Sequence, residues 1–266
     1  MPARHLRIVE KTGRATIAGI AEIGYGAFLL GESLFWLVMG KSRRQPVRFG
    51  AVVAEAMEFG VRAIPIVAIL SGTVGAMLAI QGIHTLKTFG AESRVTFGVA
   101  LSVVREFAPL ITGIVVAGRS GSALAARLGT MRINQEIDAL HVMGIDPVRF
   151  LVAPALLAML AVLPLLTLLA DFVALTGAGM YICMDLGMDF PAYWERVIES
   201  LKVDDLGHGL GKSVIFAVLV TLVGVVNGSL VQGGAEGVGK ATTRSVVHAI
   251  SAIVVTDMLF AFVLTR

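Results

Sequence analysis

The stretch FGVRAIPIVAILSGTVGAMLAIQGIHTL, residues 59–86, contains a single charged side chain, Arg62. An α-helix needs about 20 apolar residues to cross a hydrocarbon core of about 30 Å, so this stretch is long enough to span a membrane. Further apolar stretches of similar length occur along the chain, and each predicts another crossing: 95–128, 147–183, 209–231 and 245–265. The sequence therefore predicts five transmembrane helices.

The composition supports this class of protein. Of the 266 residues, 56% are hydrophobic and 15% are charged, which lies outside the usual range of soluble domains. The apolar runs are much longer than barrel strands and do not alternate with polar residues, so an outer-membrane barrel is excluded. We expect an all-α integral membrane protein with one domain, residues 1–266. It divides into a basic N-terminal region, 1–48, and a five-span core, 49–266.

The distribution of Lys and Arg predicts the orientation. Basic residues collect before residue 49 and around 129–147, whereas the loop near 185–205 is mainly acidic. Because Lys and Arg favour the cytosolic side, we expect a cytosolic N-terminus and a C-terminus on the opposite, outer side. Residues 15–39 are long enough to cross, but basic clusters flank both of their ends. We favour an N-terminal helix lying in the membrane interface, with a sixth span as the alternative.

Residues 129–147, GTMRINQEIDALHVMGIDP, interrupt two apolar stretches with a short polar one. Apolar and polar side chains alternate there at helical spacing, which predicts an amphipathic helix over 134–143. Its apolar face holds Ile133, Ile137 and Leu140, and its polar face holds Gln135, Glu136, Asp138 and His141. We expect Asn134 as its N-cap, Gly144 as its stop, and Asp146-Pro147 as the cap and first turn of the next span.

Two interpretations of this short helix follow from its pattern alone. It is either an ordinary loop helix resting on the membrane surface or a coupling helix whose charged face docks on a soluble partner. A helix of this length is marginal in water, so packing must hold it in either case.

Five ionisable residues lie inside the predicted spans: Arg105, Glu106, Asp171, Lys212 and Asp257. A charge at the centre of a lone helix costs about 2.5–3.5 kcal/mol on insertion scales, so these groups should face protein or water. One interpretation is structural, with Arg105 paired to Glu106 or Asp257 and Lys212 reaching the outer surface. The other is a path or cavity for the polar end of an amphipathic substrate.

Other kinds of site are not indicated. The stretch GHGLGKS at 207–213 has Leu206 where a phosphate-binding loop requires glycine, so we expect no nucleotide site on this chain. The five histidines are scattered, and we expect no metal site and no cofactor. The net charge of +3 is explained by the cytosolic ends, so nucleic-acid binding is not expected.

Three stretches carry a resemblance to a known family. They are AGRSGSALAARLGTMRINQEIDALHVMGIDPVRFLVAPALLAMLAVLPLLTLLAD (117–171), LSVVREFAPLITGIVVAGR (101–119) and KATTRSVVHAISAIVVTDMLF (240–260). They resemble the MlaE/YrbE permeases, which are membrane subunits of lipid ABC transporters that work with MCE-domain proteins. The resemblance covers roughly residues 50–265.

The resemblance implies a homodimeric permease in the inner membrane of a double-membraned bacterium, with a phospholipid substrate. It implies that ATP and magnesium are bound by a separate cytosolic ATPase, so that this chain is not an enzyme. It also implies an outer, periplasmic partner with an MCE domain. In the family the ATPase docks on the helix between spans two and three, which here is the predicted helix 134–143.

The resemblance also assigns candidate residues. It implies substrate contacts from the intramembrane charges other than Asp171, which are Arg105, Glu106, Lys212 and Asp257. It also supports acyl-chain contacts from three apolar residues at the end of the first span, Leu78, Leu86 and Phe89. For the ATPase contact, the amphipathic pattern selects Glu136, Ile137, Asp138, Leu140 and His141. Two other classes stay open: an ion-coupled transporter using Arg105, Glu106 and Asp257 as a proton relay, and a structural scaffold. Inverted repeats would favour the first of these, and none is evident.

Overall fold

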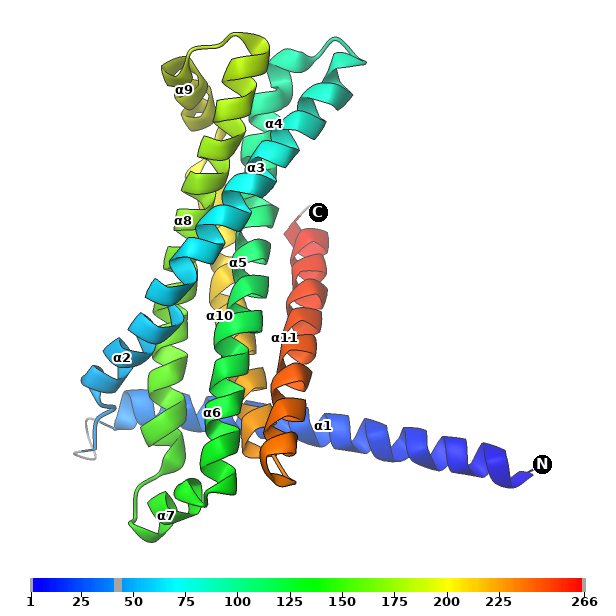
Figure 1. Cartoon of the computed structure of the whole chain (residues 1–266), viewed down its shortest axis with the longest axis vertical. Helices are drawn as coiled ribbons and strands as arrows, with labels where there is room; N and C mark the ends of the chain where they lie inside the picture. The colour runs from blue at the N-terminus through cyan, green and yellow to red at the C-terminus, as the bar shows by residue number, and fades with distance from the viewer. Residues whose placement is uncertain (1, 41–44, 265–266) are drawn as a thin grey trace.

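The computed structural model describes residues 2–40 and 45–264, and every regular element within them is a helix. Five long helical segments run along one another as a bundle (Figure 1). Each is long and apolar enough to cross a membrane: Phe49–Lys87, Glu92–Ile133, Val148–Leu186, Val203–Ser229 and Gly234–Val263. The five predicted spans are confirmed as helices, although several begin earlier or end later than the apolar pattern indicated.

The first two segments are not single regular helices. The first is composed of α2 (Phe49–Phe59), the 3₁₀ turn η1 (Val61–Ala63) and α3 (Ile64–Lys87). The second is composed of η2 (Glu92–Arg94), α4 (Val95–Ser102), the π turn η3 (Val103–Phe107), α5 (Ala108–Val116), the π turn η4 (Ala117–Gly121) and α6 (Ser122–Ile133). π turns inside α-helices are often found at functional sites.

The remaining segments are more regular. The third combines the π turn η5 (Val148–Val152) with α8 (Ala153–Leu186), and it is followed by α9 (Phe190–Ser200), α10 (Val203–Ser229) and α11 (Gly234–Leu264). The short helices α7 (Glu136–Val142) and α9 lie at opposite ends of the bundle (Figure 1). This arrangement gives the bundle two distinct ends.

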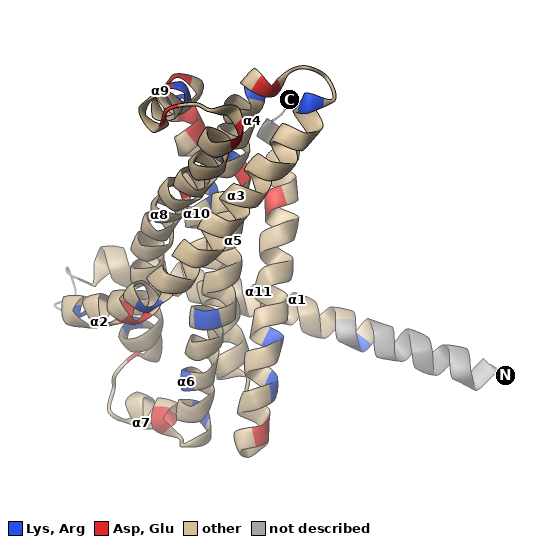
Figure 2. Ribbon diagram, turned by 45° about the horizontal axis from the view of Figure 1, so that its top comes forward, with Lys and Arg blue, Asp and Glu red and all other residues tan. Residues whose placement is uncertain are grey.

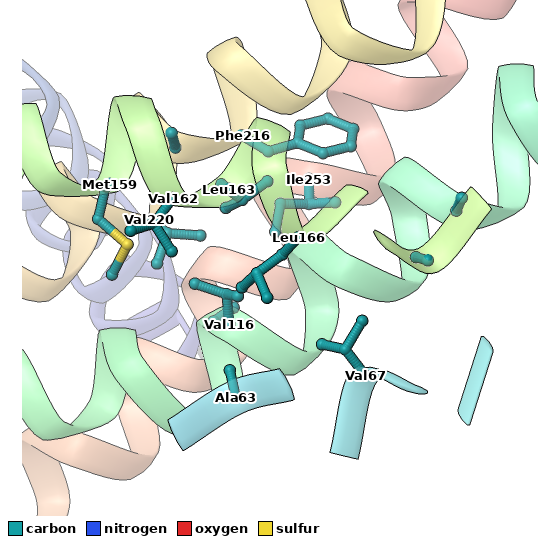
Figure 3. Packing of buried hydrophobic residues seen from close by; sticks show 14 of the residues in the cluster. Ala63, Val67, Val116, Met159, Val162, Leu163, Leu166, Phe216, Val220 and Ile253 are labelled. Atoms are coloured by element: carbon teal, nitrogen blue, oxygen red, sulfur yellow. The ribbon is translucent and has the colours of Figure 1, made fainter. Parts of the chain in front are cut away.

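The five segments share one hydrophobic core. Figure 3 shows side chains from α3, α5, α8, α10 and α11 meeting in it, among them Val67, Val116, Leu163, Phe216 and Ile253. All five are 0% exposed. The segments therefore fold as one unit, and a movement of one helix changes the packing of its neighbours.

Helices α3 and α8 approach each other closely because glycines line their contact. A Cβ atom on Gly75 would lie 1.9 Å from the carbonyl oxygen of Ala174, and one on Gly177 would lie 2.4 Å from that of Gly72. Small residues allow such backbone contact between membrane helices, where van der Waals packing replaces the hydrophobic drive of water.

Helix α1 (Pro2–Met39) lies across the lower end of the bundle and projects beyond it (Figure 1). Its Thr16–Met39 part is long and apolar enough to be a candidate span by composition. Arg244 of α11 donates a 2.6 Å hydrogen bond to Glu22 Oε2, which attaches α1 to the bundle. The direction of α1 relative to the other helices is thus set by tertiary contacts and not by its composition.

The polar stretch forms α7, but its start differs from the prediction. Asn134 follows α6 and is not the N-cap of α7; Gln135 takes that position in the left-handed conformation, with a φ of 58°. The two downstream predictions hold. Gly144 has a φ of 72° just after the helix, and Asp146 Oδ1 accepts a 3.0 Å hydrogen bond from the backbone N–H of Arg149.

Helix α9 packs on the bundle through two buried side chains, Tyr193 and Val197. The hydroxyl of Tyr193 donates a 2.8 Å hydrogen bond to the carbonyl oxygen of Leu175 on α8. Burial raises the pKa of the Tyr193 hydroxyl above its usual value, so it stays a neutral donor at physiological pH.

The close contact of α3 and α8 can be tested with glycine substitutions. Gly75→Ala places a methyl group against the Ala174 backbone and should lower the free energy of unfolding by about 1–3 kcal/mol, the usual cost of overpacking. Gly98→Ala in α4, where nothing lies within 4 Å of the added Cβ, is the matched control. Equilibrium unfolding in mixed micelles measures both, and equal stability of the two variants would contradict the packing argument.

Candidate functional site

A buried lysine connects three helical segments in the half of the bundle towards α9. Lys212 of α10 is 1% exposed, and its Nζ lies 2.5 Å from Glu106 Oε2 of η3 and 2.9 Å from Asp257 Oδ1 of α11. The possibility that Lys212 reaches the outer surface is therefore wrong. A buried ammonium group is tolerated because two carboxylates neutralise it.

A second ion pair lies beside the first. Arg105 Nε donates a 2.7 Å hydrogen bond to Asp205 Oδ1, and Asp205 also accepts one of 2.8 Å from the backbone N–H of Lys202 at the start of α10. The predicted pairing of Arg105 with Glu106 or Asp257 is wrong, because Glu106 and Asp257 are both bound to Lys212. Asp205 is the residue that sequence reasoning missed.

The local geometry of η3 and α10 explains this pairing. Asp205, Gly209 and Lys212 follow one another at helical spacing and share a face of α10. A Cβ on Gly209 would lie 2.3 Å from the carbonyl oxygen of Val104, so the η3 backbone rests directly on α10. At this short distance the adjacent residues Arg105 and Glu106 reach two different partners. The spacing of Asp205 and Lys212 is the signal in the sequence that could have identified Asp205.

We call Arg105, Glu106, Asp205, Lys212 and Asp257 the charge network. Its inner members, Asp205, Lys212 and Asp257, are largely covered, while Arg105 and Glu106 are each more than a third exposed. The network therefore presents one cation and one anion at its open edge. Such an edge can contact both charges of a zwitterionic group while the buried members hold it in place.

Asp171 stands apart from the charge network. Its side chain is buried in α8, and its Oδ1 has no hydrogen-bond partner in the described part of the chain. None of the ion pairs among residues 2–40 and 45–264 includes it. The structure thus brings together four of the five intramembrane charges noted in the sequence.

The three apolar candidates of the first span separate into two places. Leu78 and Leu86 line a groove of about 320 Å³ between α3 and α4, which extends to Ser102 just before η3. Phe89 follows the end of α3 and is largely exposed. The groove adjoins the charge network along the chain, whereas Phe89 does not line it.

The described residues include no group of three or more His, Cys, Asp or Glu side chains placed to hold a metal ion.

Helix α7 has one face towards the bundle and one towards solvent. Leu140 is buried, and Ile137 and His141 line a cavity of about 310 Å³ between α1, α6, α7, η5 and α10. Glu136 and Asp138 are on the exposed face. The amphipathic pattern is confirmed for Ile137 and Leu140, whereas Ile133 ends α6 and is 36% exposed.

The exposed end of α7 also carries apolar residues that were not selected from the sequence. Val142 is 89% exposed and Met143 is 63% exposed. They follow His141 directly, beyond the last apolar position of the helical pattern. Charged and apolar side chains together make this end of the bundle suited to contact another protein.

The charge network predicts a specific stability pattern. Lys212→Met leaves two carboxylates without their cation and should lower the free energy of unfolding by about 3–5 kcal/mol, as expected for breaking a buried pair. Adding Glu106→Gln and Asp257→Asn to Lys212→Met should recover much of this loss. Equilibrium unfolding in mixed micelles gives the values; an unchanged stability of Lys212→Met would contradict the pairing.

Comparison with known proteins places the chain in a family. The family model described as "Permease MlaE" matches residues 52–263. The chain is 30% identical over 260 residues to the intermembrane phospholipid transport system permease protein MlaE of Haemophilus influenzae, covering 97% of this chain and 98% of that protein. It is 29% identical over 260 residues to a probable ABC transporter permease protein of Rickettsia typhi, covering 96% and 98%. It is also 32% identical to one of Synechocystis over 238 residues, covering 89% and 88%. Within residues 2–40 and 45–264, six helices are long and apolar enough to cross a membrane, and the chain belongs to the MlaE permease family of multi-pass membrane proteins.

Proposed function

We propose that this chain is the permease subunit of an ATP-driven phospholipid transporter in a bacterial inner membrane. It works as a homodimer with a cytosolic ATPase, which binds ATP and magnesium, and with a periplasmic MCE-domain protein that exchanges lipid with it. The observation that carries the proposal is the charge network, which lies within spans that are otherwise apolar. The names of the relatives support the same class of function.

A phospholipid fits the chemistry of the charge network and its surroundings. Arg105 suits the phosphate of a headgroup because its guanidinium is a planar, permanently charged donor. Glu106, half-exposed beside it, suits the cationic part of a zwitterionic headgroup. The apolar groove containing Leu78 and Leu86 lies next along the chain and is suited to an acyl chain. The substrate thus spans a polar and an apolar region of one protomer.

The second protomer would complete this site. Helix α11 carries Asp257 of the charge network, yet its most apolar window is only 11% buried. Its uncovered residues include Val254, Val255, Met258, Leu259 and Phe262. Packing of α11 and its neighbours against a second copy would enclose the open edge of the charge network between the two subunits.

The two ends of the chain fit the same arrangement. In the proposed orientation α7 faces the cytosol and α9 the periplasm, with the N-terminus inside and the C-terminus outside. Helix α1 lies across the bundle, as an interfacial helix would (Figure 1). Its apolar side chains, such as Ile17, Ile20 and Ile23, are mostly exposed in one protomer, which suits the membrane interface.

Helix α7 would serve as the coupling helix. It is short, joins the second and third spans, and packs on the bundle through Leu140. A force on its exposed face would therefore reach α6 and η5 directly. Closing of the ATPase would tilt these spans, and the shared core would carry the movement to the charge network.

Charge reversal on α7 tests the coupling. Glu136→Lys combined with Asp138→Lys should reduce co-purification of the ATPase at least tenfold. An ATPase surface that binds the two carboxylates would then face two lysines, and like charges at an interface cost several kcal/mol. Glu236→Lys is the control, since Glu236 is exposed on α11 in a local pair with Lys240. Retention of the ATPase by the double variant would refute the docking role, and a wild-type complex without any ATPase would favour the ion-coupled alternative.

Neutral substitutions in the charge network test substrate binding. Glu106→Gln and Asp257→Asn should each reduce lipid transfer by the assembled complex about tenfold or more, since a charge-assisted bond is worth about 1.5–3 kcal/mol. Transfer of fluorescent phospholipid between proteoliposomes and the periplasmic partner measures this. Glu195→Gln, on the exposed face of α9, is the control. Normal transfer by both variants in an intact complex would favour a scaffold.

A further inference from the structure

Two arginines at the α7 end of the bundle are held against aromatic rings. The guanidinium carbon of Arg48 lies 5.8 Å from the ring centre of Phe150, and that of Arg149 lies 5.4 Å from the ring centre of Trp36. Stacking on an aromatic ring fixes a guanidinium by its flat face. The N–H groups along its edge then stay available to another partner.

No carboxylate of the described residues forms an ion pair with either arginine. Asp146 Oδ1 accepts a 3.0 Å hydrogen bond from the backbone N–H of Arg149 and not from its guanidinium. Both arginines line one cavity of about 430 Å³, together with Gln45 and Phe150. The cavity thus collects two permanent positive charges and an amide without a matching negative charge.

The cavity lies where two candidate spans begin. Arg48 directly precedes the candidate span Phe49–Lys87, and Arg149 is the second residue of Val148–Leu186. Trp is enriched at membrane interfaces, which suits the place of Trp36. Phe49 and Val38, neighbours of Arg48 and Trp36 in sequence, are each at least 75% exposed. The segments that carry the two arginine–ring contacts therefore also expose apolar side chains.

We propose that Arg48 and Arg149 bind the phosphate of an anionic phospholipid from the membrane leaflet on the α7 side. Two arginine edges match phosphate oxygens with charge-assisted hydrogen bonds. The acyl chains would lie along the exposed apolar residues near the cavity. A lipid is favoured over a soluble phosphate compound because the cavity opens between the starts of two membrane spans.

This lipid site is separate from the charge network. The network lies in η3, α10 and α11, in the half of the bundle towards α9, whereas the arginine cavity lies at the end occupied by α2 and α7 (Figures 1 and 2). The proposal rests on residence in a membrane and does not depend on the transport function. A bound lipid here would brace α1 against the start of the third span, next to α7.

The two tryptophans of the chain allow a direct test. Trp194→Phe removes the one on α9 and leaves Trp36 as the only tryptophan, beside Arg149. We would measure quenching of Trp36 fluorescence by phosphatidylglycerol or phosphatidylcholine with brominated acyl chains, using the Trp194→Phe protein in mixed micelles. Phosphatidylglycerol should quench at lower mole fractions. Arg48→Gln with Arg149→Gln should weaken its apparent binding roughly tenfold or more and remove the preference.

Controls separate this site from general attraction of anionic lipid to a basic protein. Lys240→Gln, which removes an exposed cation on α11, should leave the preference intact. Arg48→Lys with Arg149→Lys keeps the charge but loses the planar donors, and it should weaken binding to an intermediate degree. Near-ultraviolet circular dichroism and normal elution in gel filtration would establish that each variant is folded.

Three outcomes would overturn the proposal. Equal quenching by the two lipids in the Trp194→Phe protein would remove the selectivity. An unchanged preference in the double glutamine variant would place the lipid elsewhere. Displacement of the brominated lipid by inorganic phosphate at low millimolar concentration would show a soluble phosphate site. Each outcome leaves the test of lipid transfer through the charge network unaffected.

Discussion

The structure depends on neutralising one buried ammonium group. Lys212 lies inside the bundle, where an unpaired charge would cost several kcal/mol, and it is tolerated only because Glu106 and Asp257 come from two other segments to meet it. The second, fourth and fifth spans must therefore keep one register relative to each other. The Arg105–Asp205 pair is a second ionic contact between the second and fourth spans, and it fixes the same register.

Close backbone contact makes these pairs possible. Gly209 lets η3 rest on α10, and the glycines between α3 and α8 hold the first and third spans together in the same way. The π turn η3 carries two of the five charges, so the irregular part of the second span and the polar part of the bundle coincide. A charged site within a membrane bundle thus requires small residues as much as it requires charged ones.

The two ends of the bundle have different roles in our proposals. Towards α9, the charge network offers an opposed pair of charges at its open edge, suited to a headgroup that enters and leaves. Towards α7, the arginine cavity holds two positive charges with no negative partner among the described residues, suited to a lipid that stays. A headgroup bound beside α7 would lie next to the helix on which the ATPase is expected to act.

The sequence by itself determined the membrane class, the five long helical segments of the bundle and the short helix α7, because hydrophobic length and helical periodicity are local properties. It also identified four members of the charge network by the cost of placing them in a membrane. The sequence did not identify Asp205 as the partner of Arg105, and the predicted pairing of Arg105 was wrong for this reason. The predicted helix 134–143 also began two residues before the observed start of α7 at Glu136. Only the tertiary structure decided these points and the placing of Arg48 and Arg149 at one cavity, because they depend on helix register and backbone proximity between segments far apart in the chain.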